Sequence, residues 1–335
     1  MIVDVHGHFT TAPSRLDAYR GRQLSMLNQP VRGSLAVSEE ELFASLVPLL
    51  DQMTGRGIDV VMLSPRAAGM GHDIGDAVVS EHWTQINNDL IARACAVHPR
   101  RLVPVCQLPQ SPGVAPAALC AELDRCAEAG FAGCLLNPDV SGGLAPFTPS
   151  LRDRAWYPLW ERLCELAMPV MVHASATRNP AMNLHGAHYI AQDHAAVVEL
   201  CMSSVFDDFP ELAVIVPHGG GGIPFQFNRQ RALHVLQGRR PFEEAVRNLY
   251  FDTAVYDADS MEMLLRKVGP DNVMFGSEMF GTAKSIDPET GRAFDDNLPL
   301  LTSVPGLSEK DLDQVLSGNA RRLFPRARAV LGEAT

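Results

Sequence analysis

Short apolar runs alternate with longer amphipathic runs along this whole chain, and this alternation restricts its fold more than any other feature. The apolar runs have the length of buried strands, and each is followed by a stretch with helical periodicity. The expected strands are Ile2–Val5, Ile58–Leu63, Leu102–Cys106, Phe131–Leu136, Pro169–Val172, Leu212–Val216, Leu249–Phe251 and Asn272–Phe275. The expected helices are Glu39–Thr54, Glu81–Val97, Pro116–Ala129, Asp153–Leu166, His194–Phe206, Ile223–Leu236, Ser260–Val268 and Glu309–Leu316. Eight successive strand–helix units favour an α/β fold whose parallel sheet closes into a (β/α)8 barrel, the TIM barrel.

An open, doubly wound parallel sheet is the alternative arrangement of the same units. It is disfavoured because no G-x-G-x-x-G motif follows the first strand. The chain has 335 residues, 46% of them hydrophobic, and contains no low-complexity tract or linker. Since this length is ordinary for a barrel, we expect a single domain over residues 1–335.

Two strand-to-helix connections, Ser64–Ser80 and Ala174–Asp193, are unusually long. The connections on this side of a barrel build its active site. We therefore expect both segments to form a lid or to bind substrate. Plain surface loops are the alternative, which is disfavoured for Ser64–Ser80 because it carries Arg66 and His72.

Charge and composition exclude several classes of function. The formal net charge is −11 with no basic cluster, which argues against nucleic acid as a partner. No apolar run approaches the ~18 residues of a membrane span, and no secretory signal is visible. The seven cysteines are scattered and contain no C-x-x-C pair, which favours free thiols in a reducing cytoplasm.

Polar side chains with metal-binding chemistry recur where the expected strands end. His6 and His8 follow the first strand and, being two residues apart, project from the same face. His173 ends the fifth strand, His218 ends the sixth, and Glu278 follows the eighth. A barrel brings all five to one mouth. Because imidazole and carboxylate groups bind divalent cations, the pattern predicts a metal site there.

Eight short segments, spread over nearly the whole chain, carry a family resemblance. They are Asp4–Pro13, Ser64–Ala67, Leu108–Val114, Leu136–Asp139, Gly186–Tyr189, Pro217–Gly221, Ser277–Met279 and Gly318–Arg322. The chain resembles the amidohydrolase superfamily, in the branch of metal-dependent decarboxylases and hydratases related to aminocarboxymuconate semialdehyde decarboxylase. Within that branch it is most similar to the 4-oxalomesaconate hydratases.

The resemblance implies one divalent metal ion per chain, expected to be zinc, with His6, His8, His173 and Glu278 as ligands. Binuclear relatives bridge two metals with a carboxylated lysine on the fourth strand. In this chain no lysine occurs before Lys267, and the residue at the end of the fourth strand is Asn137. A lysine bridge between two metals is therefore impossible. Many relatives have aspartate where this chain has Glu278, and the hydratases have glutamate.

The implied reaction is the addition of water to 4-oxalomesaconate, a tricarboxylate from the degradation of protocatechuate or gallate. The product is 4-carboxy-4-hydroxy-2-oxoadipate. Glu278 is the expected base, and His173 or His218 assists proton transfer or holds the enolate. His218 has a second interpretation as a fifth metal ligand.

Several further side chains are expected to bind the substrate. Arg66 and Arg229 are candidates to bind substrate carboxylates through bidentate hydrogen bonds. Arg229 is equally compatible with a surface ion pair. Residues expected to line the mouth are His72, Asn137, His188 and Tyr189. Asp252, at the end of the seventh strand, is expected either to support the residues of the site or to have a structural role. A homo-oligomer is also expected.

Two other functions remain open from the sequence. The first is decarboxylation of an aromatic or muconate-type acid with the same metal ligands. The second is a metal-binding barrel without catalytic activity, which requires an incomplete site.

Overall fold

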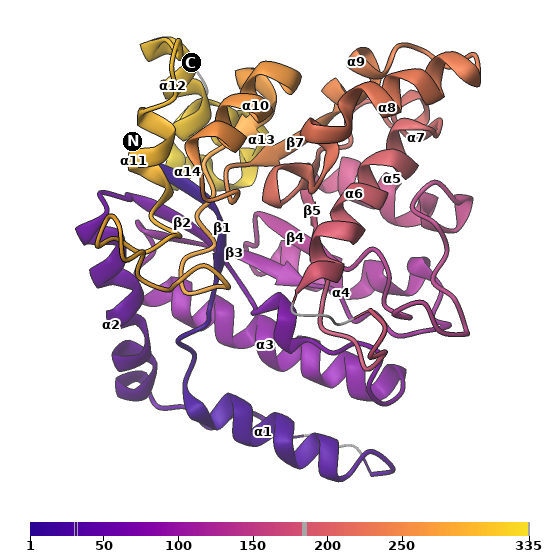
Figure 1. Cartoon of the computed structure of the whole chain (residues 1–335). Helices are drawn as coiled ribbons and strands as arrows, with labels where there is room; N and C mark the ends of the chain where they lie inside the picture. Colours follow the sequence, from indigo (N-terminus) through magenta and orange to yellow (C-terminus); the bar gives the residue numbers. More distant parts are fainter. Residues whose placement is uncertain (30, 32, 183–185, 334–335) are drawn as a thin grey trace.

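The barrel is present in the computed structural model, which describes residues 1–29, 31, 33–182 and 186–333 (Figure 1). Eight strands lie in the order in which they occur in the sequence, and each pairs in parallel with the next. They are β1 (Val3–His8), β2 (Val60–Ser64), β3 (Leu102–Gln107), β4 (Gly133–Leu136), β5 (Val170–Val172), β6 (Val214–Val216), β7 (Leu249–Asp252) and β8 (Val273–Met274).

Backbone hydrogen bonds join the last part of the sheet to β1. The Val5 N–H donates to the Phe275 carbonyl at 3.0 Å, and the Glu278 N–H donates to the His6 carbonyl at 3.0 Å. The sheet is therefore nearly closed, which confirms the barrel and excludes the open sheet. The same contacts place the segment after β8 beside the end of β1.

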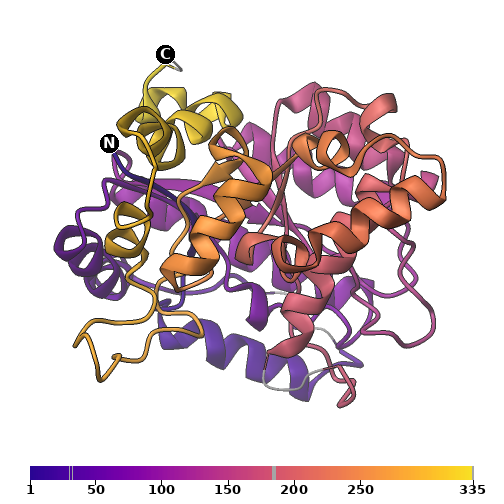
Figure 2. The same ribbon diagram turned by 45° about the horizontal axis from the view of Figure 1, so that its top comes forward.

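The helices surround the sheet (Figures 1 and 2). They are α1 (Ser14–Ser25), α2 (Glu39–Gly55), α3 (Ala77–Val97), α4 (Cys120–Glu128), α5 (Tyr157–Leu166), α6 (Ala187–Cys201), α7 (Val205–Asp208), α8 (Ile223–Leu236), α9 (Phe242–Ala245), α10 (Ala258–Val268), α11 (Asn297–Thr302), α12 (Glu309–Asp313), α13 (Asn319–Leu323) and α14 (Arg328–Leu331). No helix within the described ranges is both long and apolar enough to cross a membrane.

Several helices differ from the sequence-based prediction, which lacks α1 and the short helices α9, α11, α13 and α14 and places the start of α6 too late. Helix α6 begins at Ala187 and ends at Cys201, so the prediction of a loop up to Asp193 is wrong over its last part. Its N-terminus is preceded by Gly186 at φ +82° and has no capping side chain, so the usual sequence signal is absent. Helix α1 is missing from the prediction because it is largely polar and also lacks a side-chain cap.

Two apolar layers hold the barrel together. The larger layer lies between the sheet and the helices and contains residues such as Val61, Leu136 and Trp160. The smaller one fills the barrel interior with strand residues such as Val5 and Met62, together with C-terminal residues of α13 and α14. Because α13 and α14 lie at the end of the barrel where β1 begins (Figure 1), the opposite end is left for the site.

A change of register in β1 directs its histidines. The pairing of β1 with β2 shifts between Asp4 and Gly7. Val3 and Val5 belong to the interior layer, yet His6 and His8 also point to the interior at the strand end. The shift therefore changes which residues face inwards, as irregularities next to active sites often do.

Candidate metal centre

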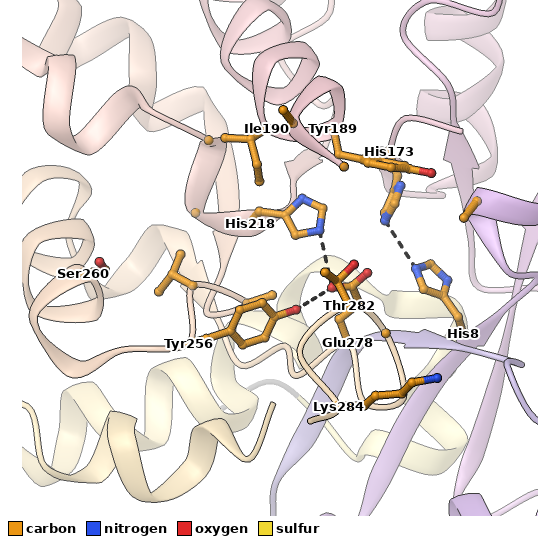
Figure 3. A pocket seen from close by; sticks show the side chains of 18 of the residues that line it. His8, His173, Tyr189, Ile190, His218, Tyr256, Ser260, Glu278, Thr282 and Lys284 are labelled. Atoms are coloured by element: carbon orange, nitrogen blue, oxygen red, sulfur yellow. Dashed lines mark hydrogen bonds and ion pairs between the residues drawn. The ribbon is translucent and has the colours of Figure 1, made fainter. Parts of the chain in front are cut away.

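Four buried side chains converge at the mouth of the barrel: His6, His8, His173 and Glu278. One ligand atom from each lies within 4.8 Å of all the others. His6 and His8 come from β1, His173 follows β5, and Glu278 comes from the segment after β8. Figure 3 shows how His8, His173 and Glu278 lie. The structure thus brings together the four residues that the sequence analysis proposed as ligands.

The ring orientation of each histidine is set by a partner behind it. His6 Nδ1 lies 2.7 Å from Asp252 Oδ2, and His173 Nδ1 lies 2.8 Å from the Ala174 carbonyl oxygen. Both partners are acceptors, so each Nδ1 carries the proton.

His8 has the same tautomer for a related reason. Its Nδ1 lies 2.8 Å from Ser64 Oγ. The Ser64 hydroxyl donates its single hydrogen to the Gly7 carbonyl at 2.9 Å, so its oxygen accepts from His8.

These tautomers leave the three Nε2 lone pairs facing one another. The Nε2 atoms of His6 and His8 are 3.1 Å apart, and those of His8 and His173 are 3.3 Å apart. Burial lowers the pKa of His8 to about 3 and that of His173 well below its usual value, which keeps both rings neutral. Converging lone pairs on neutral imidazoles repel unless a cation lies between them. The donor set therefore fits a divalent metal ion.

Glu278 has two further neighbours. The Tyr256 hydroxyl donates a hydrogen bond to Glu278 Oε2, and His218 Nε2 lies 3.7 Å from the same oxygen. Burial raises the pKa of Glu278, but the adjacent His218 outweighs it and holds that pKa well below the usual value. The carboxyl group is therefore ionised.

His218 is held from its other side by Asp193, whose Oδ2 lies 2.7 Å from His218 Nδ1. Burial lowers the pKa of His218, but the carboxylates of Asp193 and Glu278 outweigh it and raise that pKa well above its usual value. The result is a charged imidazolium between two carboxylates, with Tyr256 at the end of the row (Figure 3).

The backbone is specialised where Glu278 projects. Glu278 has φ +50°, a region that residues other than glycine rarely adopt. At Gly281 an added Cβ would lie 2.8 Å from Glu278 Cδ, so a glycine there leaves the carboxylate room to fold back over the chain. At Gly276 an added Cβ would meet His6 Cβ at 3.0 Å and Asp252 Cβ at 2.9 Å. Both glycines permit the close packing of the site.

A cavity of about 960 Å³ opens over the cluster. Its lining includes His8, His173, His218 and Glu278, and also Arg66 and Tyr189 among the substrate-binding candidates. The Tyr189 ring lies 6.0 Å from the His173 ring between centroids.

The other four substrate-binding candidates do not line this cavity. His72 and Asn137 are buried: His72 Nδ1 lies 3.5 Å from Ser80 Oγ, and Asn137 Oδ1 accepts from the Asp139 N–H at 3.1 Å. His188 lies behind Tyr189, with its Nε2 3.0 Å from the Ser175 carbonyl. Arg229 is on an exposed part of α8. Local packing, rather than proximity in sequence to a strand end, decides these orientations.

Three residues at the site were not predicted from the sequence. Tyr256 follows β7 and Lys284 follows β8, so both had the positional signal that strand ends provide. Asp193 lies within α6, and nothing in its local sequence distinguishes it from a surface acid. Asp252 supports His6 as expected.

Comparison with known proteins gives a consistent result. Residues 3–326 match the family described as "Amidohydrolase". The chain is 39% identical over 336 residues to a 2-keto-4-carboxy-3-hexenedioate hydratase from Sphingobium sp. (strain NBRC 103272 / SYK-6), covering 99% of this chain and 98% of that protein. It is also similar to the crystal structure of a 4-oxalomesaconate hydratase from Rhodopseudomonas palustris. That match has a TM-score of 0.90 and 38% identity, and covers 99% of this chain and 98% of the other.

A more distant structure shows the fold alone. It is a dihydroxybenzoic acid decarboxylase from Polaromonas sp. JS666 with bound manganese and an inhibitor. The match has a TM-score of 0.71 and 20% identity, and covers 97% of this chain and 96% of the other.

Proposed function

The chain belongs to the amidohydrolase family, and we propose that it is a metal-dependent hydro-lyase that converts 4-oxalomesaconate to 4-carboxy-4-hydroxy-2-oxoadipate. The observation that carries this proposal is the full-length match, at 38–39% identity, to two hydratases. Their substrates, 4-oxalomesaconate and 2-keto-4-carboxy-3-hexenedioate, have the same carbon skeleton, and in the second the C3=C4 double bond is conjugated to the C2 keto group. The decarboxylase match, at 20% identity, supports only the fold.

We assign one divalent ion per chain to His6, His8, His173 and Glu278. Three imidazoles and one carboxylate suit zinc, and the manganese in the decarboxylase structure makes manganese the second candidate. A cation in this position supplies Lewis-acid polarisation and makes a water molecule more acidic. Asp252, Ser64 and the Ala174 carbonyl keep the ligand rings in the required tautomer.

The residues around the cavity account for the proton transfers. The keto group of the substrate makes C4 electrophilic, and the electron pair of the double bond moves into an enolate when the water oxygen bonds to C4. Glu278, an ionised carboxylate, accepts the proton of that water. His218, charged and oriented by Asp193, donates a proton to C3 as the enolate collapses, and regains one from Glu278 Oε2, 3.7 Å from its Nε2.

Substrate binding is assigned to the polar groups of the cavity wall. Arg66 reaches the cavity from the connection after β2 and pairs with a substrate carboxylate. Tyr189 presents its ring and hydroxyl beside His173. Burial and the nearby Glu278 raise the pKa of Tyr189 to about 12, so its hydroxyl stays protonated and donates to an anionic group.

The wider setting of the proposal follows from this substrate. The reaction belongs to the degradation of protocatechuate or gallate. A cytoplasmic location is proposed from the scattered, odd-numbered cysteines, and assembly into a homo-oligomer is part of the same proposal.

The test is to incubate the metal-loaded protein with 4-oxalomesaconate and follow its ultraviolet absorbance, the product by NMR, and carbon dioxide. We expect loss of absorbance, formation of the 4-hydroxy product and no carbon dioxide. Treatment with a chelator abolishes the activity, and restoring the ion recovers it. Release of carbon dioxide without the hydroxy product would replace this proposal with the decarboxylase function.

A further inference from the structure

Besides the imidazolium of His218, the side chains of Arg66 and Lys284 bring positive charge to the cavity, and they come from different parts of the barrel. Arg66 belongs to the connection after β2, and Lys284 belongs to the segment after β8. Among the described residues of the cavity wall, they are the only arginine and lysine. Figure 3 shows Lys284 on the chain segment below Glu278, with its amine on the side of His8.

Backbone hydrogen bonds pair the chain on both sides of Lys284 with a later segment. The Asp295 N–H donates to the Ala283 carbonyl at 3.0 Å, and the Phe294 N–H donates to the Ser285 carbonyl at 3.0 Å. A bridge between Ile286 and Ala293 continues the pairing. Lys284 therefore lies between two hydrogen-bonded neighbours in a hairpin-like loop formed by residues 283–295.

Asp295 anchors this loop to the rest of the barrel. Asp295 is fully buried, and its Oδ1 lies 2.7 Å from Arg56 Nη2, next to the end of α2. Its Oδ2 accepts the Phe280 N–H at 3.0 Å. The ion pair fixes this loop to the end of α2, and the hydrogen bond fixes it to the segment that carries Glu278. The fold therefore determines where Lys284 enters the cavity wall.

The charge of Lys284 has no partner within the described ranges, where no carboxylate forms an ion pair with it. Arg66 has only a long contact, 3.6 Å from Asp17 Oδ1, with the two side chains 49% and 73% exposed. Such an exposed pair contributes little. A chain with a net charge of −11 thus presents two available cations at its cavity.

We propose that Lys284 is a substrate-binding residue that, with Arg66, selects tricarboxylates over acids with fewer carboxylates. This inference rests on the proposed function and names the residue that recognises its substrate class. The Asp193 carboxylate offsets the imidazolium of His218, so besides the metal ion Arg66 and Lys284 are the two positive charges left for substrate carboxylates. A tricarboxylate places one carboxylate on each of these three cationic groups, whereas an acid with fewer carboxylates leaves one of them unpaired.

The experiment measures binding separately from turnover, using the metal-loaded protein. Isothermal titration calorimetry compares tricarballylate, an unreactive tricarboxylate, with glutarate, a dicarboxylate. The variants are Lys284→Met and Lys284→Arg, with Lys310→Met as the matched control because Lys310 lies on α12, outside the cavity. Thermal melts verify that each variant is folded.

We expect Lys284→Met to weaken tricarballylate binding by roughly 10-fold and glutarate binding by much less, since one charge-assisted contact is lost. Lys284→Arg keeps most of the affinity, and Lys310→Met keeps all of it. With 4-oxalomesaconate, Lys284→Met raises KM by a similar factor and leaves kcat within about threefold.

The outcomes separate this inference from the proposed function. If the wild-type protein prefers tricarballylate and Lys284→Met removes that preference, Lys284 is the selecting residue even if no hydration is observed. If folded Lys284→Met binds both acids as the wild type does, the inference is refuted, whatever the enzyme's activity. Failure of the wild-type protein to prefer tricarballylate also refutes it.

Discussion

Asp252 controls the tautomer of His6, and replacing it with asparagine tests whether the four-residue cluster binds metal. The Asp252 side chain is fully buried, and both of its oxygens are used. Oδ2 accepts the Nδ1–H of His6 at 2.7 Å, and Oδ1 accepts the Ala254 N–H at 3.1 Å. The side chain introduced by Asp252→Asn has one acceptor and one NH2 donor in the same space.

Either orientation of the new amide is unfavourable. If its nitrogen faces His6, the ring proton moves to Nε2 and occupies the lone pair that binds the cation. If its nitrogen faces Ala254, two N–H donors oppose each other, at a cost of about 1–3 kcal/mol for an unsatisfied buried group. Changes of this kind behind a metal ligand typically lower metal affinity about 10- to 100-fold, or about 1.4–2.7 kcal/mol.

The assay is a titration of the metal-free protein with Zn²⁺ and with Mn²⁺ against a competing chelating indicator. We expect Asp252→Asn to raise the Kd of both ions by about 10- to 100-fold. The control is Asp257→Asn, which makes the same chemical change at the N-cap of α10, where Asp257 Oδ1 accepts the Ser260 N–H at 2.9 Å. Asparagine caps helices as well as aspartate, so the metal affinity of this control stays at the wild-type value. Equal affinities in the wild type, Asp252→Asn and the control would refute the argument.

Three further predictions concern Glu278, Tyr256 and His72. Glu278→Gln keeps the fold and much of the metal affinity but lowers kcat by about 10²–10⁴-fold. Steady-state kinetics measure this loss, with metal content determined in parallel. A near-normal kcat would mean that Glu278 is not the base. Tyr256→Phe deletes the hydrogen bond to Glu278 and lowers kcat about 10-fold with little change in KM, whereas a parallel loss of stability with unchanged kcat assigns Tyr256 to packing alone. Burial lowers the pKa of His72 from 6.5 to about 4. Between these pH values the folded state therefore binds fewer protons than the unfolded state. As a result, about 3 kcal/mol of the free energy of unfolding is lost as the pH falls from 6.5 to 4. Urea unfolding at several pH values measures this loss, and His72→Gln, which lacks the titrating group, shows a flatter dependence.

The barrel and the four converging residues were predictable from the sequence because both depend on local pattern. Runs of apolar residues set the order of strands and helices, and a parallel sheet with right-handed connections places every strand end on one side. His6 and His8 lie at the end of β1, and His173 and Glu278 follow β5 and β8, so the prediction of their convergence needed no knowledge of packing.

The partners of those residues were decided by the tertiary structure. Asp252 and His6 are 246 positions apart, and the distance between their atoms depends on how β7, β8 and β1 pack. Asp193 reaches His218 from within α6, a helix whose start has no capping signal. No local pattern records such contacts, because side-chain packing between distant elements creates them.

The sequence by itself thus determined the barrel, its order of strands and the residue types at its mouth. Only the tertiary structure decided which of these side chains face the cavity. Arg66 and Tyr189 line it, while His72 and His188 are packed behind its wall and Lys284 enters it unexpectedly. The physical reason is that backbone periodicity is local, whereas a side chain's direction depends on the space left by residues far away in the sequence.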